Sequence, residues 1–492
     1  PSNFNTTGSI LWFTWFIVRI FDVRFMTDSI FERVIRIIQV SCMLGFTIVV
    51  STFDPEDPFK DIVDTADKNS LDMNTFQILY HEGLILMTVR ISLVAQYCSI
   101  YWFCYQGNKH GSNHIKPTGR GKPLLAAAAI HFVAAMIYLG ISSLFNYNRD
   151  SPLYIVWYIG SAMEATLQLG LACRYEELRF DDTKLTERLA VFTVVVLGEG
   201  VSETTKTILL VVQLGGKSIA TTYFLYLLYF DWMNHETLSG HRQLIYSLLH
   251  FPLHAALLLL GTGSALFIKF WKADYNDRIS SWSKTEVGES KFSNKSAAIA
   301  ESIWNLTMGN DAEYPSKYIS TWNDVSVALD NIRSIPDWFW NSTHETNITE
   351  YRRLSSIYYS SADTVILAVH DSVFATYELE AKKWSKSSVN SSRSEKMYSR
   401  METTFQYVYA SAGAALLLMI VLQALTLPRR RRSSFNYIRL SLFVLAGLFL
   451  SLFPLISISK DKAGEDNFIQ GPWVLPTICL VVFVVFVLTH LH

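Results

Sequence analysis

Eleven long apolar stretches constrain this chain of 492 residues more than any other feature. A helix needs about 20 apolar residues to cross a bilayer, because each residue rises about 1.5 Å and the hydrocarbon layer is about 30 Å thick. Helices are required, since backbone amides in lipid have no water to bond to. The sequence therefore predicts an all-α, polytopic transmembrane helical bundle. Its spans are expected at residues 9–23, 34–53, 83–106, 123–146, 152–174, 189–213, 219–235, 244–270, 404–427, 436–457 and 472–491.

The distribution of charge divides the chain into three regions. Charged residues make up only 17% of the chain, but residues 271–403 hold 33 of the 85. We therefore expect an eight-span region (1–270), an extramembrane insertion (271–403) and a three-span region (404–492). Seven tryptophans and a helical repeat of apolar residues predict that the insertion is a mainly helical cap, either a packed lid or a binding domain. The net charge of −1 gives no reason to expect nucleic acid as a partner.

Loop charges predict the orientation, because cytoplasmic loops collect Lys and Arg. Residues 107–122 and 429–432 are basic and are expected in the cytosol, as is the C-terminus. Residues 54–72 are acidic and are expected on the opposite side, together with the insertion. The chain begins at Pro1 and not at Met, so we expect that further residues precede it.

Glycosylation sequons agree with this orientation. Five Asn-x-Ser/Thr motifs fall in the insertion, at Asn294, Asn305, Asn341, Asn347 and Asn390. They predict a glycoprotein of the eukaryotic secretory pathway, in the plasma membrane or in a vacuolar or other internal membrane. The five cysteines all fall in predicted spans, so no disulfide framework is expected outside the membrane.

Ionisable side chains at membrane depth are the candidate functional groups, because burying a charge in lipid is costly unless it is paired or hydrated. Arg188 and Glu199 are eleven residues apart and share one face of a helix, with Glu187 beside Arg188. Glu203 and Lys206 continue that face and are spaced to pair with each other. The neighbouring Gly198 and Gly200 would allow either a close helix contact or a local break of the helix.

Three further candidates lie in neighbouring spans. Glu164 is at the middle of its span, at a depth similar to that of Glu199, and the two carboxylates could share a proton or hold a cation. Arg90 is the expected partner for such a carboxylate. His131 could relay protons, although a hydrogen-bonded core histidine is the simpler interpretation. All of these residues could instead form ion pairs that fix helix packing and conduct neither ions nor protons.

Other polar groups in the spans have simpler interpretations. Asp231 ends its span at the cytosolic side and could interact with Arg242. His250 and His254 flank Pro252, where we expect a kink with hydrogen-bonded histidines. We predict no metal site, because such a site needs three or four ligands.

Several of these residues resemble the signature of the low temperature requirement A family. The run Leu185 to Arg188, followed by Val195 to Glu199, carries the closest resemblance. Arg90 to Tyr97, the Tyr-Phe-Asp element ending at Asp231 and the Tyr-x-x-x-His-x-Pro pattern ending at Pro252 agree with it. The resemblance covers about residues 10–270. It implies a shared membrane architecture and marks as preferred site residues Arg90, Glu187, Arg188, Glu199 and Asp231.

The chain departs from the family pattern in three places. Lys184 stands where the family has a histidine, and Leu189-Ala190 replaces Phe-Gly. The family's first helix, with its acidic motif, is absent. The insertion and the last three spans look like a eukaryotic, fungal elaboration.

These patterns favour an ion- or proton-conducting transporter or channel. Its path would use Glu164, Glu199, Glu187, Glu203, Asp231, Arg90, Arg188 and His131. The alternatives are a non-conducting structural or assembly protein and, less in keeping with the absence of an enzyme motif, a membrane enzyme acting on lipid or glycan. We predict no cofactor. Membrane lipids are the expected partners, and a bound lipid or sterol and a homodimer are both compatible with the sequence.

Overall fold

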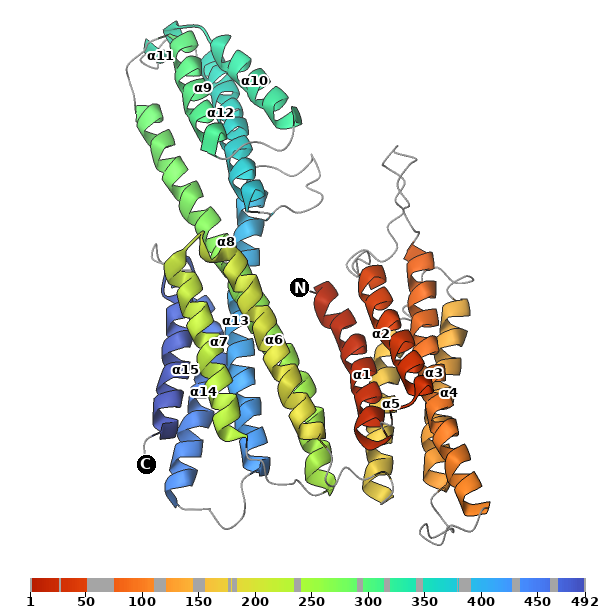
Figure 1. Ribbon diagram of the computed structural model, residues 1–492. Helices are drawn as coiled ribbons and strands as arrows, with labels where there is room; N and C mark the ends of the chain where they lie inside the picture. The colour runs from red at the N-terminus through yellow and green to blue at the C-terminus, as the bar shows by residue number, and fades with distance from the viewer. Residues whose placement is uncertain are drawn as a thin grey trace. The chain divides into compact units, whose positions relative to one another are not determined.

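A computed structural model provides the structure of the chain, which is almost entirely helical in its described parts (Figure 1). The structure describes residues 2–25, 28–50, 75–109, 121–144, 155–175, 178, 184–233, 240–289, 295–313, 319–341, 348–377, 379, 391–426, 434–460 and 468–490. No strand occurs among these residues, so the predicted all-α class is confirmed. The basic and acidic loops on which the predicted orientation rests lie outside them, apart from a few flanking residues.

The chain divides into two compact units. The first contains residues 1–194, 233–255 and 421–431, and the second contains the remainder. Three helices, α6 (Leu185–Ile208), α8 (Gly240–Glu289) and α13 (Ser391–Thr426), contribute residues to both units.

The first unit is built mainly from five helices: α1 (Ser2–Phe25), α2 (Ile30–Val50), α3 (Thr75–Lys109), α4 (Gly121–Leu144) and α5 (Ile155–Arg174). The helix α3 packs along α2 and α4, while α5 packs against α1 and α4. Apolar side chains from α1, α3, α4 and α5 form a shared core that includes Phe16, Leu93, Ala127 and Leu169. The start of α2 is fixed by a capping residue, since Ser29 Oγ accepts the Glu32 amide at 3.2 Å.

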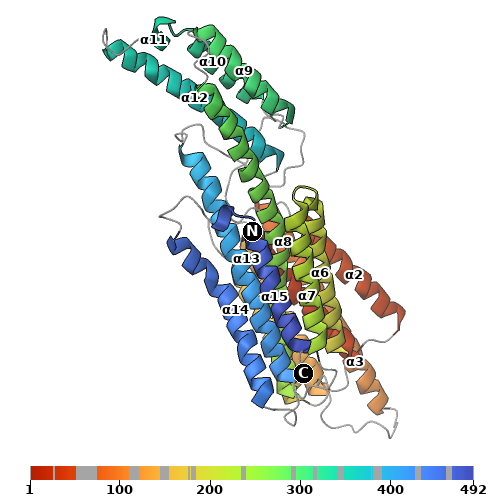
Figure 2. The same cartoon turned by 90° about the vertical axis from the view of Figure 1, so that its left-hand side faces the viewer.

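The second unit contains the remaining apolar helices: α7 (Val212–Trp232), α13 (Ser391–Thr426), α14 (Ser434–Lys460) and α15 (Val474–His490), with a short 3₁₀ turn at Phe468–Gln470. The helix α15 packs against α7 and α14, and α13 lies beside α14 and α15 (Figure 2). A Cβ atom added to Gly413 on α13 would lie 2.6 Å from the Gly447 carbonyl oxygen on α14. Small residues therefore bring these two backbones together, as is common between helices in lipid.

The predicted insertion folds as a helical bundle of its own, formed by α9 (Ser296–Glu313), α10 (Ile319–Arg333), α11 (Trp338–Asn341) and α12 (Ile348–Thr376). Figure 1 shows these helices near the C-terminal part of α8, which extends into the insertion as far as Glu289. Ala300, Val325, Leu329, Ile332 and Val365 form its core. The prediction of a mainly helical insertion is thus confirmed.

Each of the eleven predicted spans overlaps a helix in its described residues, although the predicted span 189–213 runs past the end of α6 at Ile208 and into the start of α7. By length and composition, five described segments are apolar enough to cross a membrane: Tyr80–Gln106, Gly121–Leu144, Arg242–Asn276, Ser399–Thr426 and Tyr437–Leu455. Val474–His490 is a shorter apolar helix. The helices α1, α2, α5, α6 and α7 occupy the other predicted ranges but fall short of this standard in length, hydropathy or charge.

Candidate functional site

Two of the predicted site residues form a buried ion pair inside the first unit. Arg90 lies on α3 and Glu164 on α5, and their side chains are 0% and 2% exposed. Arg90 Nε donates a hydrogen bond to Glu164 Oε2 at 3.1 Å. The pair therefore lies in the protein core.

The second oxygen of Glu164 contacts His131 on α4. His131 Nδ1 is 2.6 Å from Glu164 Oε1, and Gln168 Nε2 is 2.9 Å from His131 Nε2. Because the carboxylate can only accept and the amide nitrogen can only donate, this pattern assigns the proton of a neutral imidazole to Nδ1. Gln168 also donates to the backbone oxygen of Ala127 at 3.0 Å, which supports the amide orientation. We call the three residues the Arg90–Glu164–His131 cluster.

The surroundings of the cluster are polar on one side and aromatic on the other. Arg90 Nη1 donates to Thr14 Oγ1 on α1 at 2.8 Å, and the guanidinium carbon lies 4.9 Å from the ring centre of Tyr138. Tyr97 stacks on the His131 ring, with 5.5 Å between the ring centres. Arg90 Nη2 and Gln168 Oε1 are buried without a hydrogen-bond partner among the described residues. The cluster thus combines a fixed cation, a carboxylate and an imidazole, with hydrogen-bonding capacity left over.

Close packing of α3 against α4 and α5 brings these side chains together. At Gly83 an added Cβ would lie 1.7 Å from Ser142 Oγ and 3.2 Å from the Trp157 ring. Only glycine permits this approach, which positions the three helices two turns from Arg90 along α3.

The predicted residues of α6 are placed differently. Glu187 and Glu199 are exposed and Arg188 is half-buried. Glu203 pairs with Lys206 at 2.5 Å, as expected from their spacing. The helix continues without a break through Gly198 and Gly200, so the close-contact alternative applies: an added Cβ on Gly261 of α8 would lie 2.5 Å from the Gly200 Cα.

Asp231 pairs with a residue that the sequence analysis did not select. Its Oδ2 is 3.4 Å from His490 Nε2 at the end of α15, and both side chains are partly exposed. This contact forms because α7 packs along α15.

The histidines of α8 form part of the core of the first unit. Trp12 Nε1 donates to His254 Nδ1 at 2.9 Å, and His254 Nε2 lies 2.8 Å from Thr193 Oγ1. His250 Nδ1 bonds to the Tyr246 carbonyl at 2.8 Å. Both histidines are buried and hydrogen-bonded, as predicted, and no group of three or more metal-ligating side chains is found in the described part of the chain.

Two buried carboxylates of the first unit escaped the sequence analysis. Glu82 on α3 is 4% exposed and Glu32 on α2 is 6% exposed. Gln96 Nε2 donates to Glu32 Oε2 at 2.5 Å, and Gln39 links Gln96 to Ser92. The two carboxylates precede the predicted spans 83–106 and 34–53 by one and two residues, so helix boundaries drawn slightly longer would have included them.

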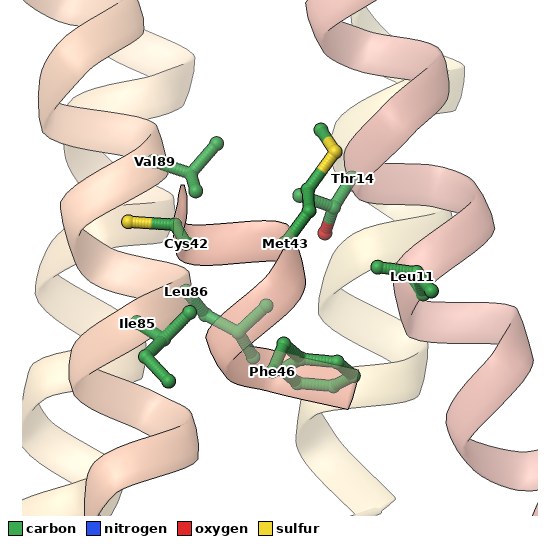
Figure 3. A pocket seen from close by; sticks show the side chains of 8 residues that line it. All are labelled: Leu11, Thr14, Cys42, Met43, Phe46, Ile85, Leu86 and Val89. Atoms are coloured by element: carbon green, nitrogen blue, oxygen red, sulfur yellow. The ribbon is translucent and has the colours of Figure 1, made fainter. Parts of the chain in front are cut away.

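A small apolar groove lies beside the cluster, between α1, α2 and α3 (Figure 3). It is lined by Leu11, Thr14, Cys42, Met43, Phe46, Ile85, Leu86 and Val89, and its empty volume is about 200 Å³, including open space. Thr14 is the polar residue of the lining, and its hydroxyl is already bonded to Arg90. The groove therefore offers no polar path to the cluster.

The remaining predicted sites have simple outcomes. The five cysteines are free, as expected. Asn305 is exposed on α9, and Asn341 lies on α11. Asn294, Asn347 and Asn390 lie outside the described residues.

A comparison with family models identifies the family of this chain. The model of the bacterial low temperature requirement A protein (LtrA) matches residues 3–283, which is more than half of the chain. The chain belongs to the LtrA family. The match spans helices α1 to α8 almost completely, so the Arg90–Glu164–His131 cluster lies within the LtrA region, whereas α9 to α15 lie beyond it. No curated protein and no solved structure matches the chain.

Proposed function

We propose that this LtrA family protein moves protons, or an ion coupled to protons, across the membrane by way of the Arg90–Glu164–His131 cluster. One observation carries the proposal: the buried carboxylate of Glu164 is shared between a permanent cation and an imidazole. Ionisable groups at such depth are rare and usually functional. Protonation of this carboxylate would remove its charge attraction to Arg90.

The geometry supports a simple proton cycle. In the resting state Glu164 is ionised, Arg90 balances its charge, and His131 is neutral with its proton on Nδ1. A proton that binds at His131 Nε2 in place of the Gln168 hydrogen bond makes an imidazolium. Transfer of the Nδ1 proton to Glu164 Oε1 then neutralises the carboxylate and removes the Coulomb attraction that holds Arg90. Proton binding is thereby coupled to release of the ion pair between α3 and α5.

The cluster suits a proton better than a metal cation. A proton needs one oxygen or nitrogen atom, whereas cations such as Ca²⁺ take six or more oxygen ligands. The cluster supplies a single carboxylate, and Arg90 repels any second cation.

A structural role is the second candidate, and it has its own support. Both oxygens of Glu164 have partners, and the adjacent groove is apolar. A buried pair of this kind can fix helix packing although no ion or proton passes through it. The transport role predicts proton flux across the membrane, whereas the structural role predicts none.

We also propose the setting in which the protein acts. The sequons and loop charges support a eukaryotic secretory-pathway membrane, with residues 271–403 on the extracytoplasmic side and the C-terminus in the cytosol. Membrane lipids surround the helices, and self-association as a homodimer belongs to the same proposal.

Reconstitution tests the proposed function. Liposomes containing the full chain and a pH-sensitive dye are expected to dissipate a pH gradient faster than empty liposomes, and the Glu164→Gln variant is expected to lose this flux. Asp28→Asn is the matched control, since Asp28 forms an exposed pair with Arg33 in the same unit. Absence of flux in the wild-type protein for protons and for monovalent ions would overturn transport and favour the structural role.

A further inference from the structure

Glu82 is a buried carboxyl group that the proposed proton cycle does not yet use. Its side chain is 4% exposed, and its Oε1 is buried without a hydrogen-bond partner among the described residues. Among the described residues of this unit, three other carboxylates are buried, and each has partners: Asp22 contacts Arg19 and Arg36, Glu164 contacts Arg90, and Glu32 accepts from Gln96. Among these four, Glu82 is the one with an unsatisfied oxygen.

Burial without a partner restricts the chemical state of such a group. An isolated ionised carboxylate in apolar surroundings costs far more free energy than the neutral acid, so the group holds a proton or a cation. A cation would need several further oxygen ligands, and the described residues contain no group of three acidic, histidine or cysteine side chains. A proton needs only the unsatisfied oxygen.

The position of Glu82 relates it to the cluster. It precedes Arg90 by eight residues on α3, which corresponds to about 12 Å along the helix. The adjacent Gly83 packs directly against Ser142 of α4 and Trp157 of α5. Glu82 thus lies at the turn where the three helices of the cluster approach one another.

Hydroxyl groups occupy the intervening turns of α4 and α5. Ser142 is one turn from Tyr138 and donates to its carbonyl at 2.7 Å. The Tyr138 hydroxyl lies 2.8 Å from Ser161 Oγ, and Ser161 is one turn from Glu164. Tyr138 also lies under the Arg90 guanidinium. Groups that can both donate and accept a proton therefore lie between the turn of Glu82 and the cluster.

We propose that Glu82 is a second proton-binding residue of this protein, at the N-terminal end of the buried face of α3, and that it exchanges protons with Glu164. The inference rests on the proposed function. In each exchange the proton leaves an oxygen of Glu82 and arrives at an oxygen of Glu164, so one carboxyl group becomes ionised as the other becomes neutral. The hydroxyls of Ser142, Tyr138 and Ser161 lie along the route.

Two measurements on the full chain in liposomes test this assignment. The first is labelling by a hydrophobic carbodiimide, which reacts with protonated carboxyl groups in apolar surroundings, followed by peptide mass spectrometry. We expect modification of Glu82 and its absence in Glu82→Gln. An unmodified Glu82 under conditions that modify another buried carboxyl group overturns the proposal.

The second measurement is proton flux. Glu82→Gln is expected to lower it by roughly a hundredfold, in the range that a positioned proton-transfer group contributes. Glu82→Asp, which keeps a carboxyl group, is expected to retain more flux, and Asp28→Asn is the control. Size-exclusion and thermal-unfolding profiles identify a variant that has lost its fold.

The outcomes separate the two proposals. Flux in Glu82→Gln equal to the wild-type flux overturns the role of Glu82 and leaves the cycle at Glu164 intact. Absence of flux in the wild-type protein overturns the proposed function, and the exchange between Glu82 and Glu164 with it.

Discussion

The Arg90–Glu164–His131 cluster and the charged face of α6 look alike in sequence but are built differently. Each places charges of both signs in apolar helices. The cluster draws its three residues from three helices, and all three are buried. The α6 residues come from one helix, and Glu187 and Glu199 are exposed while Glu203 pairs with the adjacent Lys206.

The difference shows what helical spacing can and cannot establish. Spacing places Arg188 and Glu199 on one face of a helix, but it does not determine what that face contacts. A buried charge is informative when the residues that exclude water from it can be named, as they can for the cluster. By this criterion the cluster is a better candidate for a functional site than the charged face of α6.

The largest expected effect comes from removing one member of the buried pair. Arg90→Ala leaves Glu164 buried without its cation and is expected to lower the free energy of unfolding by about 3–5 kcal/mol. Lys206→Ala breaks an exposed pair and is expected to change stability little. Denaturant unfolding in detergent micelles compares the two. Equal losses would mean that burial does not distinguish the regions.

A double variant sharpens this test. Replacing Arg90 and Glu164 together by apolar residues, as in Arg90→Met with Glu164→Leu, removes the uncompensated charge. Most of the stability lost in Arg90→Ala is then expected to return, since well-packed apolar replacements of buried pairs are often neutral or stabilising. A double variant that is no more stable than Arg90→Ala would contradict the account of the pair.

The glycine contact between α6 and α8 allows a test of intermediate size. Gly261→Ala places a methyl group 2.5 Å from the Gly200 Cα and is expected to cost about 1–3 kcal/mol through overpacking. Gly198→Ala is the matched control, because an added Cβ there meets nothing within 4 Å. Thermal unfolding of both variants checks the expectation, and equal melting temperatures would contradict the close contact.

The smallest expected effect concerns an exposed ion pair of the insertion. A hydrogen bond from Arg353 lowers the pKa of Glu350 on α12, with burial opposing it and the charge of Arg353 adding to it. A carboxyl group whose pKa is lowered by folding stabilises the fold above its unfolded-state pKa, and this contribution is lost as pH falls through the folded-state value. Wild type and Glu350→Gln should therefore differ slightly in melting temperature at neutral pH and converge in acid. A difference that grows in acid would contradict the pairing.

The sequence predicts much of this architecture, because apolar length determines where helices must form. The same rule selected Arg90, Glu164 and His131 as ionisable groups inside apolar segments. It missed Glu82 and Glu32 because they precede the predicted spans by one and two residues, and boundaries are the least certain part of such predictions. A boundary error of this size conceals a buried charge completely.

Partners across helices were harder to predict than partners along one. The pair of Glu203 with Lys206 follows from their spacing, and so does the pair of Arg19 with Asp22, whose side chains meet at 2.7 Å. The contact of Asp231 with His490 could not be predicted, since it depends on α15 packing against α7.

Proton flux of Glu164→Gln and Glu199→Gln, measured in liposomes from parallel preparations, tests the central claim most directly. The account predicts that Glu164→Gln loses the wild-type flux while keeping its fold, and that Glu199→Gln keeps most of it, because Glu199 is exposed on α6. Retention of flux in Glu164→Gln together with its loss in Glu199→Gln would contradict the assignment of the route to the buried cluster.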